Sequence, residues 1–143
     1  MQDDRPPGRR QLDDVLDAML PFAHQMLDKH GEFFPFGAAM RRDGKVNMVA
    51  GDAENEHPAS EQIMDVIRRG MRRRHEEYLA VGVCYDVRVR PNAEAQPTDA
   101  ICVSLEHRDG TAVDVFEPYT KHRSTIDYGP LFAQPGRKTV FED

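Results

Sequence analysis

The tripeptide Arg-Asp-Gly occurs twice in this chain, at residues 42–44 and at residues 108–110, each time between two short runs of strand-forming residues. A two-residue Asp-Gly loop at the second site would pair Leu105 with Asp114, which mixes polar and apolar side chains on each face of the hairpin. A three-residue loop with a left-handed glycine pairs Leu105 with Val113 and separates the two faces. The same loop at the first site also gives a coherent apolar face. The sequence therefore predicts two tight antiparallel hairpins.

Two segments carry apolar residues at steps of three and four, the spacing typical of a helix with one apolar stripe. The first spans roughly Arg9 to Lys29, after a disordered arm predicted over residues 1–10 from their prolines and charges. The second spans roughly Ser60 to Tyr78, after a loop expected over Gly51 to Ala59. Both helices should pack their apolar stripes against the predicted sheet.

Strict alternation of apolar and polar residues over Ala80 to Arg90 predicts the clearest strand of the chain. It is followed by strands expected over Asp99 to His107 and Thr111 to Glu117. The order is then helix, two strands, helix, three strands, and the tight antiparallel connections favour the α+β class. We therefore expect a five-stranded antiparallel sheet packed by two helices. The two strands of the first hairpin are expected over Phe36 to Arg41 and Lys45 to Ala50.

Three phenylalanines, Phe33, Phe34 and Phe36, crowd the junction between the first helix and the first hairpin. So much aromatic area beside a helix end and a sheet is typical of core, although an exposed docking patch is the alternative. The tail over residues 127–143 is also too apolar to float free, so we expect it to dock on its own domain or on a partner chain. Residues 11–143 are thus predicted to form a single domain.

The overall charge argues against nucleic acid and anionic lipid as partners. The chain has a formal net charge of -6, and its densest basic run, Arg68 to Arg74, is followed at once by Glu76 and Glu77. We interpret that run as a solvated helix face. No apolar stretch approaches the roughly 18 residues that a membrane span needs, and the first residues lack the apolar centre of a secretory signal. These features predict a cytoplasmic protein with no membrane association.

No pattern of catalytic, cofactor-binding or metal-binding residues stands out. The six histidines give no pair on one helix turn or strand face, and Cys84 and Cys102, in separate strands, are predicted to be buried thiols. The best polar constellation is the second face of the predicted meander, which could be an ion-pair ladder, a dimer surface or a ligand floor. The candidate ligand or interface residues on that face, beside the two cysteines, are Asp86, Arg88, Ser104, Glu106 and Asp114.

The element order over roughly Gln11 to Glu117 resembles that of the roadblock and longin-like group of profilin-like domains. Such domains commonly use a central five-stranded antiparallel sheet in regulation and dimerisation. The run EFFPFGAAM followed by DGKV also resembles segments of short uncharacterised bacterial proteins. The resemblance implies a regulatory or dimeric module, with no site residue carried over.

Two functions from different classes remain. The first is a non-enzymatic protein-interaction or regulatory module, a homodimer or a small adaptor, which could include a toxin-neutralising partner. The second is a small-molecule-binding or hydrolytic domain that uses the polar sheet face. The absence of catalytic motifs, the acidic surface and the apolar tail favour the first.

Overall fold

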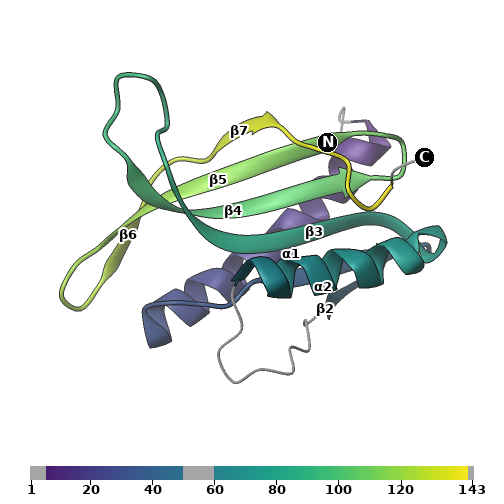
Figure 1. Ribbon diagram of the computed structural model, residues 1–143, viewed down its shortest axis with the longest axis horizontal. Coiled ribbons are helices and arrows are strands. Elements are labelled where there is room, and N and C mark those ends of the chain that lie inside the picture. Colours follow the sequence, from purple (N-terminus) through teal and green to yellow (C-terminus); the bar gives the residue numbers. More distant parts are fainter. Residues whose placement is uncertain (1–5, 50–59, 142–143) are drawn as a thin grey trace, which may run out of the picture.

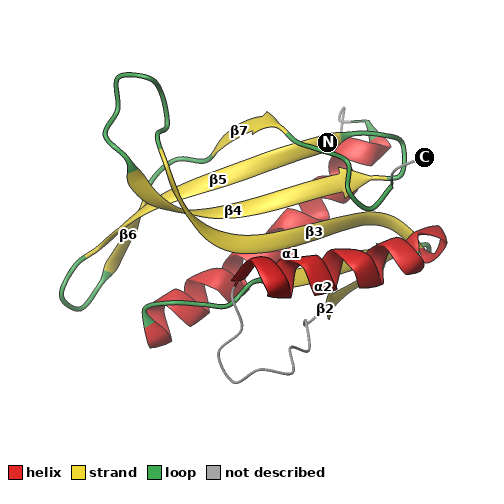
Figure 2. Ribbon diagram, in the orientation of Figure 1, coloured by secondary structure: helices red, strands yellow, loops and turns green. Residues whose placement is uncertain are grey.

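The computed structural model describes residues 6–49 and 60–141. These residues form two α-helices, a short 3-10 helix and seven strands (Figures 1 and 2). In chain order they are α1 (Pro7–His30), β1 (Phe36–Arg41), β2 (Val46–Val49), α2 (Ser60–Arg73), η1 (His75–Glu77), β3 (Tyr78–Val89), β4 (Thr98–His107), β5 (Ala112–Lys121), β6 (Ile126–Tyr128) and β7 (Phe132–Pro135). Residues 1–5 of the expected arm and the loop expected over Gly51 to Ala59 lie outside the described residues.

Helix α1 begins earlier than its apolar pattern predicts. Its first residue is Pro7, a position where proline's fixed φ suits the helix and its missing N–H costs no hydrogen bond. The helix ends at Gly31, whose φ of 75° is left-handed and whose N–H donates to the Leu27 carbonyl at 2.8 Å. Residues 7–10, expected in the disordered arm, therefore belong to the helix.

Helix α2 ends at Arg73, and the prediction that it continues to Tyr78 is wrong. The chain instead makes the short turn η1, and Tyr78 is the first residue of β3, where it lies opposite Arg41 of β1. The Tyr78 ring is 8% exposed and belongs to the core beneath α2. Tyr78, which continues the helical spacing of α2, therefore belongs to the strand that follows the helix.

The strands form one curled antiparallel sheet in the order β2-β1-β3-β4-β5-β6, with β7 also paired to β5. Both predicted hairpin registers are confirmed, since Leu105 lies opposite Val113 and Met40 opposite Val46. The two loop glycines, Gly44 and Gly110, have φ of 89° and 101°. The α+β class is also confirmed, but the five-strand count is too low because the tail adds β6 and β7 along the outer edge of β5.

The two helices cover opposite faces of the sheet (Figure 1). Helix α1 rests on β3 at Gly82, where a Cβ atom would lie 2.7 Å from the Met19 sulfur. Helix α2 rests on β1 at Gly37, where a Cβ atom would lie 2.6 Å from the terminal methyl of Met71. Glycine is needed at both places because the helices approach the sheet so closely. We refer below to the α1 face and the α2 face of the sheet.

The protein therefore has two apolar clusters, one on each face of the sheet. The expectation that the apolar residues of β3, β4 and β5 share one face is wrong. Leu105 belongs to the cluster on the α1 face, whereas Val83 belongs to the cluster on the α2 face. Each helix needs apolar partners beneath it, so β3 must be apolar on both faces where it passes between them. Of the phenylalanines, Phe33 and Phe36 are buried, whereas Phe34 is 60% exposed.

Candidate functional site

The five residues predicted to share a polar face are divided between the two faces of the sheet. Ser104 of β4 lies opposite Val83 of β3, so its side chain is on the α2 face. Asp86 lies opposite Ile101 on the α1 face. Arg88, two residues beyond Asp86, shares that α1 face, while Glu106 and Asp114 share the α2 face with Ser104. The grouping on one face is wrong because the apolar residues of β3 and β4 face opposite helices.

On the α2 face, Ser104 is part of a small hydrogen-bonded group. Its hydroxyl lies 3.2 Å from the Tyr85 hydroxyl and 4.0 Å from the Cys102 sulfur. Burial raises the pKa of the Cys102 thiol to about 11 and that of the Tyr85 phenol to about 12. Neither group is ionised near neutral pH, so this group lacks an activated nucleophile. Cys84, on the other face, is also a buried free thiol, as predicted.

Glu106 is a buried carboxylate that binds the C-terminal tail. Its side chain is on the α2 face and the residue is 5% exposed. The carboxylate accepts hydrogen bonds from the backbone N–H of Thr139 at 2.7 Å and of Val140 at 3.1 Å, and from the Thr139 hydroxyl at 2.8 Å. Its position in a strand predicted it as a site residue, but its partners, 33 residues away, had no sequence signal.

On the α1 face, polar side chains from α1, β3, β5 and β6 gather into one cluster. The Tyr119 hydroxyl donates to the Asp86 carboxylate at 2.7 Å, and His24 contacts the Glu117 carboxylate through Nε2. The His24 ring also stacks on Tyr128, with centroids 4.0 Å apart. Sequence reasoning named Asp86 but missed the rest of this cluster, although Glu117 gave a signal: it occupies an inward position between the apolar residues of β5.

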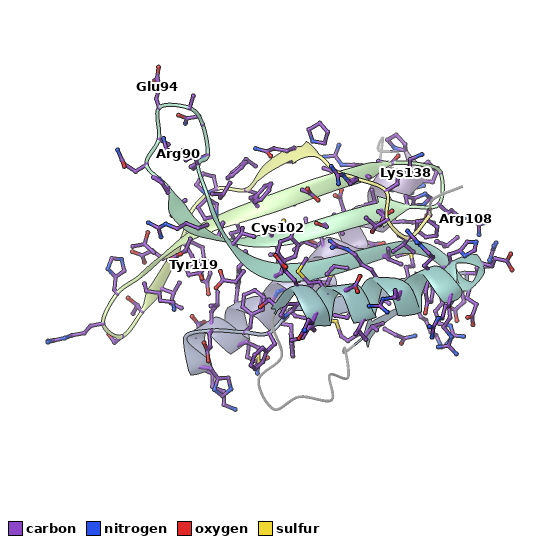
Figure 3. All side chains as sticks on the ribbon, viewed as in Figure 1. Arg90, Glu94, Cys102, Arg108, Tyr119 and Lys138 are labelled. Carbon is purple, nitrogen blue, oxygen red and sulfur yellow. The ribbon has the colours of Figure 1, made fainter. Side chains whose placement is uncertain are left out.

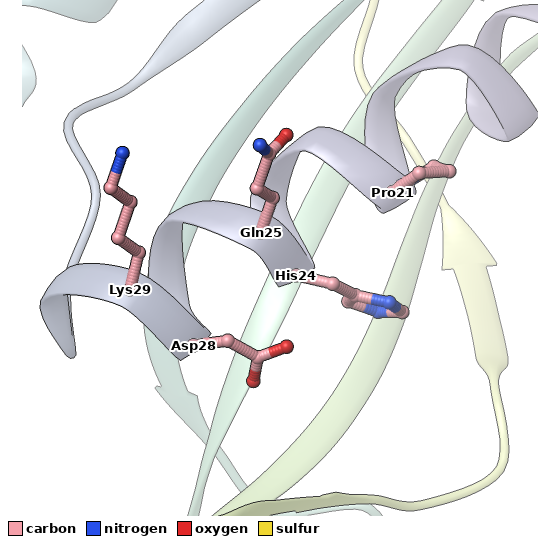
Figure 4. Close-up of a pocket in the computed structure, with 5 residues that line it drawn as sticks. All are labelled: Pro21, His24, Gln25, Asp28 and Lys29. Carbon is pink, nitrogen blue, oxygen red and sulfur yellow. The ribbon is translucent and has the colours of Figure 1, made fainter.

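A shallow depression beside this cluster exposes part of it to solvent (Figure 4). His24 and Asp28 point to one side of α1, whereas Gln25 and Lys29 point to the other. The Tyr128 hydroxyl donates to Asp28 at 3.4 Å, and burial together with this carboxylate raises the Tyr128 pKa to about 12. The cluster can bind a polar group through its imidazole and carboxylates, but its phenols stay protonated at neutral pH.

An apolar groove of about 550 Å³ lies on the same face at the other end of α1. Its walls are helix α1 and strands β5 and β7, and its volume falls in the range of small-molecule sites, roughly 300–1,000 Å³. Charged side chains also line it: Arg9, which lies 3.7 Å from Asp13, and Asp109. Its apolar lining comprises Leu12, Leu16, Leu105, Val113, Val115, Leu131, Phe132 and Ala133.

A third feature is a set of three exposed apolar side chains near the β2 side of the sheet, which we call the edge patch: Phe22 of α1, Phe34 in the segment before β1, and Met48 of β2. They are 40%, 60% and 48% exposed. The Phe22 ring packs edge-on against buried Phe36 at 4.8 Å, and Met48 lies opposite Ala38 on the α1 face. Among the described strands, β2 is an outer strand that pairs with β1 alone. The edge patch therefore lies beside a strand whose outer edge has no partner among the described strands.

The predicted basic run of α2 makes contacts within its own chain. Arg69 pairs with Asp65, Arg74 lies 3.3 Å from Glu77, and Arg72 donates to the Thr139 carbonyl at 2.8 Å. Within residues 6–49 and 60–141, no three His, Cys, Asp or Glu side chains are placed to hold a metal ion, and no helix could span a membrane. Family models, curated proteins and solved structures were compared with the chain, and none matches.

Proposed function

We propose that this protein is a non-enzymatic interaction module that works as a homodimer, with the edge patch as its dimer surface. The observation that carries the proposal is the exposure of Phe22, Phe34 and Met48 beside the outer strand β2. Large exposed apolar side chains next to unpaired strand groups favour association, because pairing buries the side chains and satisfies the N–H and C=O groups together.

A second copy of the chain is the partner that this surface fits best. Antiparallel pairing of two β2 strands around a twofold axis would place each patch against its equivalent, as a self-complementary interface requires. The order helix, two strands, helix, three strands over α1 to β5 is also the feature that resembles roadblock and longin-like domains, a group that commonly dimerises. Both points support a regulatory dimer.

The location of the interface can be tested with two matched substitutions. Met48→Glu places a charge in the patch and should shift the protein from dimer to monomer in size-exclusion chromatography with light scattering. Val66→Glu is the control, because Val66 is 40% exposed on α2, outside the patch. Circular dichroism should show both variants folded. A Met48→Glu protein that dimerises as well as the control would place the interface elsewhere.

The apolar groove supports a second candidate function, the binding of an amphipathic small molecule. An apolar chain would fill the space between α1, β5 and β7, while its polar head met Arg9, Asp13 or Asp109. Calorimetric titration with dodecanoate and with dodecylamine would test this and would show which head charge the groove accepts. Binding should carry a negative heat-capacity change, the mark of apolar burial.

Filling the groove supplies the control for this second function. Ala133 lies on its wall opposite Val115, so Ala133→Phe should abolish binding of either amphiphile. Ala93→Phe adds the same ring to an exposed loop and should leave binding unchanged. If neither amphiphile binds the wild-type chain, or if Ala133→Phe binds normally, the groove is not a site for such a ligand.

A further inference from the structure

The last described residues of the chain lie on the α2 face as a bound peptide ligand would, with a bent backbone over residues 139–141. Their backbone is held by side chains: Glu106 accepts the N–H groups of Thr139 and Val140, and Arg72 donates to the Thr139 carbonyl through Nε at 3.0 Å and Nη2 at 2.8 Å. The Phe141 N–H adds a longer contact of 3.5 Å to Glu106. These contacts read backbone groups, so they require a segment that can adopt this bent shape.

One side chain of the tail serves as the anchor. Val140 is 1% exposed and packs into the cluster on the α2 face between helix α2 and the sheet. Phe141, partly buried, packs against the edge of the same cluster. The residues that surround the anchor in this cluster are Ala39, Ile63, Ile67, Met71, Tyr78, Val81 and Val83. The apolar pocket for Val140 therefore lies directly beside the groups that bind the tail backbone.

We call the place that residues 139–141 occupy the tail seat, or seat. It can open while the strand pairing of the sheet stays intact. The strand pairing of the tail ends at Pro135, and Gly136 donates a hydrogen bond to the Ala112 carbonyl at 3.0 Å. Arg137 and Lys138, which follow, are exposed and connect the sheet to the seated residues 139–141. Opening would break the hydrogen bonds of residues 139–141 and unpack Val140, while the pairing of β7 with β5 stays in place. Release would uncover the Val140 pocket and the Glu106 carboxylate together.

We propose that this seat is a peptide-recognition site and that residues 139–141 are its built-in competitor. The partner it fits is a second protein that presents a bent segment of Ser or Thr, then Val or Ile, then an aromatic residue. The hydroxyl residue reaches Glu106 with its N–H and O–H, the β-branched residue fills the Val140 pocket, and the aromatic residue covers its edge. The site is distinct from the edge patch and from the α1-face cluster; Figure 3 places Lys138 and Tyr119 toward opposite ends of the molecule.

The tethered tail regulates such a site by competition. A segment joined by a short linker has an effective concentration on the order of millimolar, so a free peptide competes poorly until the tail is weakened or displaced. A variant with a weakened tail should therefore bind the peptide much more tightly than the wild-type chain does, because the pocket residues are unchanged.

The test uses a fluorescein-labelled synthetic peptide with the sequence of residues 137–143 and the full-length protein. Val140→Asp should release the tail and bind this peptide about tenfold or more tightly than wild type, as fluorescence anisotropy measures. Val140→Ala is a milder release variant for use if Val140→Asp proves unfolded by circular dichroism. A peptide with Asp at the anchor position should not bind either variant.

Two further substitutions in the tail-released chain locate the binding. Arg72→Ala should weaken peptide binding severalfold through loss of the carbonyl contact, whereas Arg73→Ala, its exposed neighbour on α2, removes the same charge and should change nothing. Glu106→Gln should weaken binding by about tenfold or more, since its NH₂ group would face the peptide N–H donors.

Hydrogen exchange of the wild-type chain tests the opening step independently. The amides of Thr139 and Val140 should exchange by local opening, faster than the amides of β4. Exchange of all these amides at one rate, that of global unfolding, would overturn the proposal. So would a folded release variant that ignores the peptide, or equal binding by wild type and release variant.

Discussion

Gly110 and Gly44 hold the same position in two hairpin loops that begin with Arg-Asp. Their φ values of 101° and 89° are strained for any residue with a Cβ atom. The N–H of Gly110 donates to the His107 carbonyl at 3.0 Å, and that of Gly44 to the Arg41 carbonyl at 2.9 Å. These loops were predictable from sequence because the strained residue, the turn residue and the apolar register are all local.

Replacing Gly110 by valine should destabilise the fold by about 1–3 kcal/mol, since a β-branched side chain is forced to positive φ. Gly70→Ala is a matched control. Gly70 lies in α2 at an exposed position with open space around it, so alanine should stabilise the helix by roughly 0.5–1 kcal/mol. Chemical denaturation measures both changes, and a Gly110→Val protein as stable as wild type would refute the loop assignment.

The tyrosines make stability depend on pH at the alkaline end. Burial raises the pKa of Tyr85 and of Tyr128 to about 12, and burial with the Asp86 hydrogen bond raises that of Tyr119 further. In the unfolded chain each ionises near pH 10. Because the folded pKa is the higher one, the stabilisation is complete below about pH 10 and is lost as pH rises toward 12 and beyond.

Ultraviolet titration of the phenols measures this directly. In the native protein Tyr85 and Tyr128 should ionise near pH 12, and in denaturant they should ionise near pH 10. The denaturation midpoint should also fall as pH rises between these values. Ionisation of Tyr85, Tyr119 and Tyr128 near pH 10 in the native protein would contradict the burial and the hydrogen bonds described for them.

At the scale of elements, each helix is positioned by a glycine beneath it. Gly82→Ala would place a Cβ atom 2.7 Å from the Met19 sulfur and 3.1 Å from side-chain carbons of Val15 and Leu105. Relieving that crowding should cost about 1–3 kcal/mol. Gly129→Ala is the control, since its nearest neighbour would be 3.6 Å away, and it should stay within about 0.5 kcal/mol of wild type.

Melting temperatures of the two glycine variants, with tryptic digestion of the native state, will show whether α1 is the loosened element. The prediction is a lower melting temperature for Gly82→Ala and an unchanged one for Gly129→Ala. Equal melting temperatures would mean that α1 does not rest on β3 at Gly82.

The sequence predicted which helices and strands form better than it predicted how they pack. The alternation in β3 and the helical spacing in α1 are local signals, and both elements formed where expected. The faces of β3 and β4 were misassigned because α2 covers the face opposite α1, and nothing local states which face a helix will cover. Tyr78 fitted the helical spacing of α2, but the helix ends at Arg73, and Tyr78 is buried on the α2 face as the first residue of β3.

At the scale of the whole molecule, the tail first adds strands to the sheet and then packs on the α2 face. Strands β6 and β7 extend the outer side of β5, and Val140 enters the core beneath α2. The sequence showed that the tail was too apolar to be free. Its partners, from Glu106 to Ile67, come from elements far away in the chain, so the candidate sites could be assembled only in three dimensions.

The same scale sets the test of the central claim, that the chain is a dimeric interaction module with the edge patch as its interface. Sedimentation equilibrium of the wild-type protein over a wide concentration range measures its mass without a standard. The account predicts twice the chain mass of 16.3 kDa at high concentration, with dissociation to the single chain on dilution. A mass of 16.3 kDa at every concentration would contradict it.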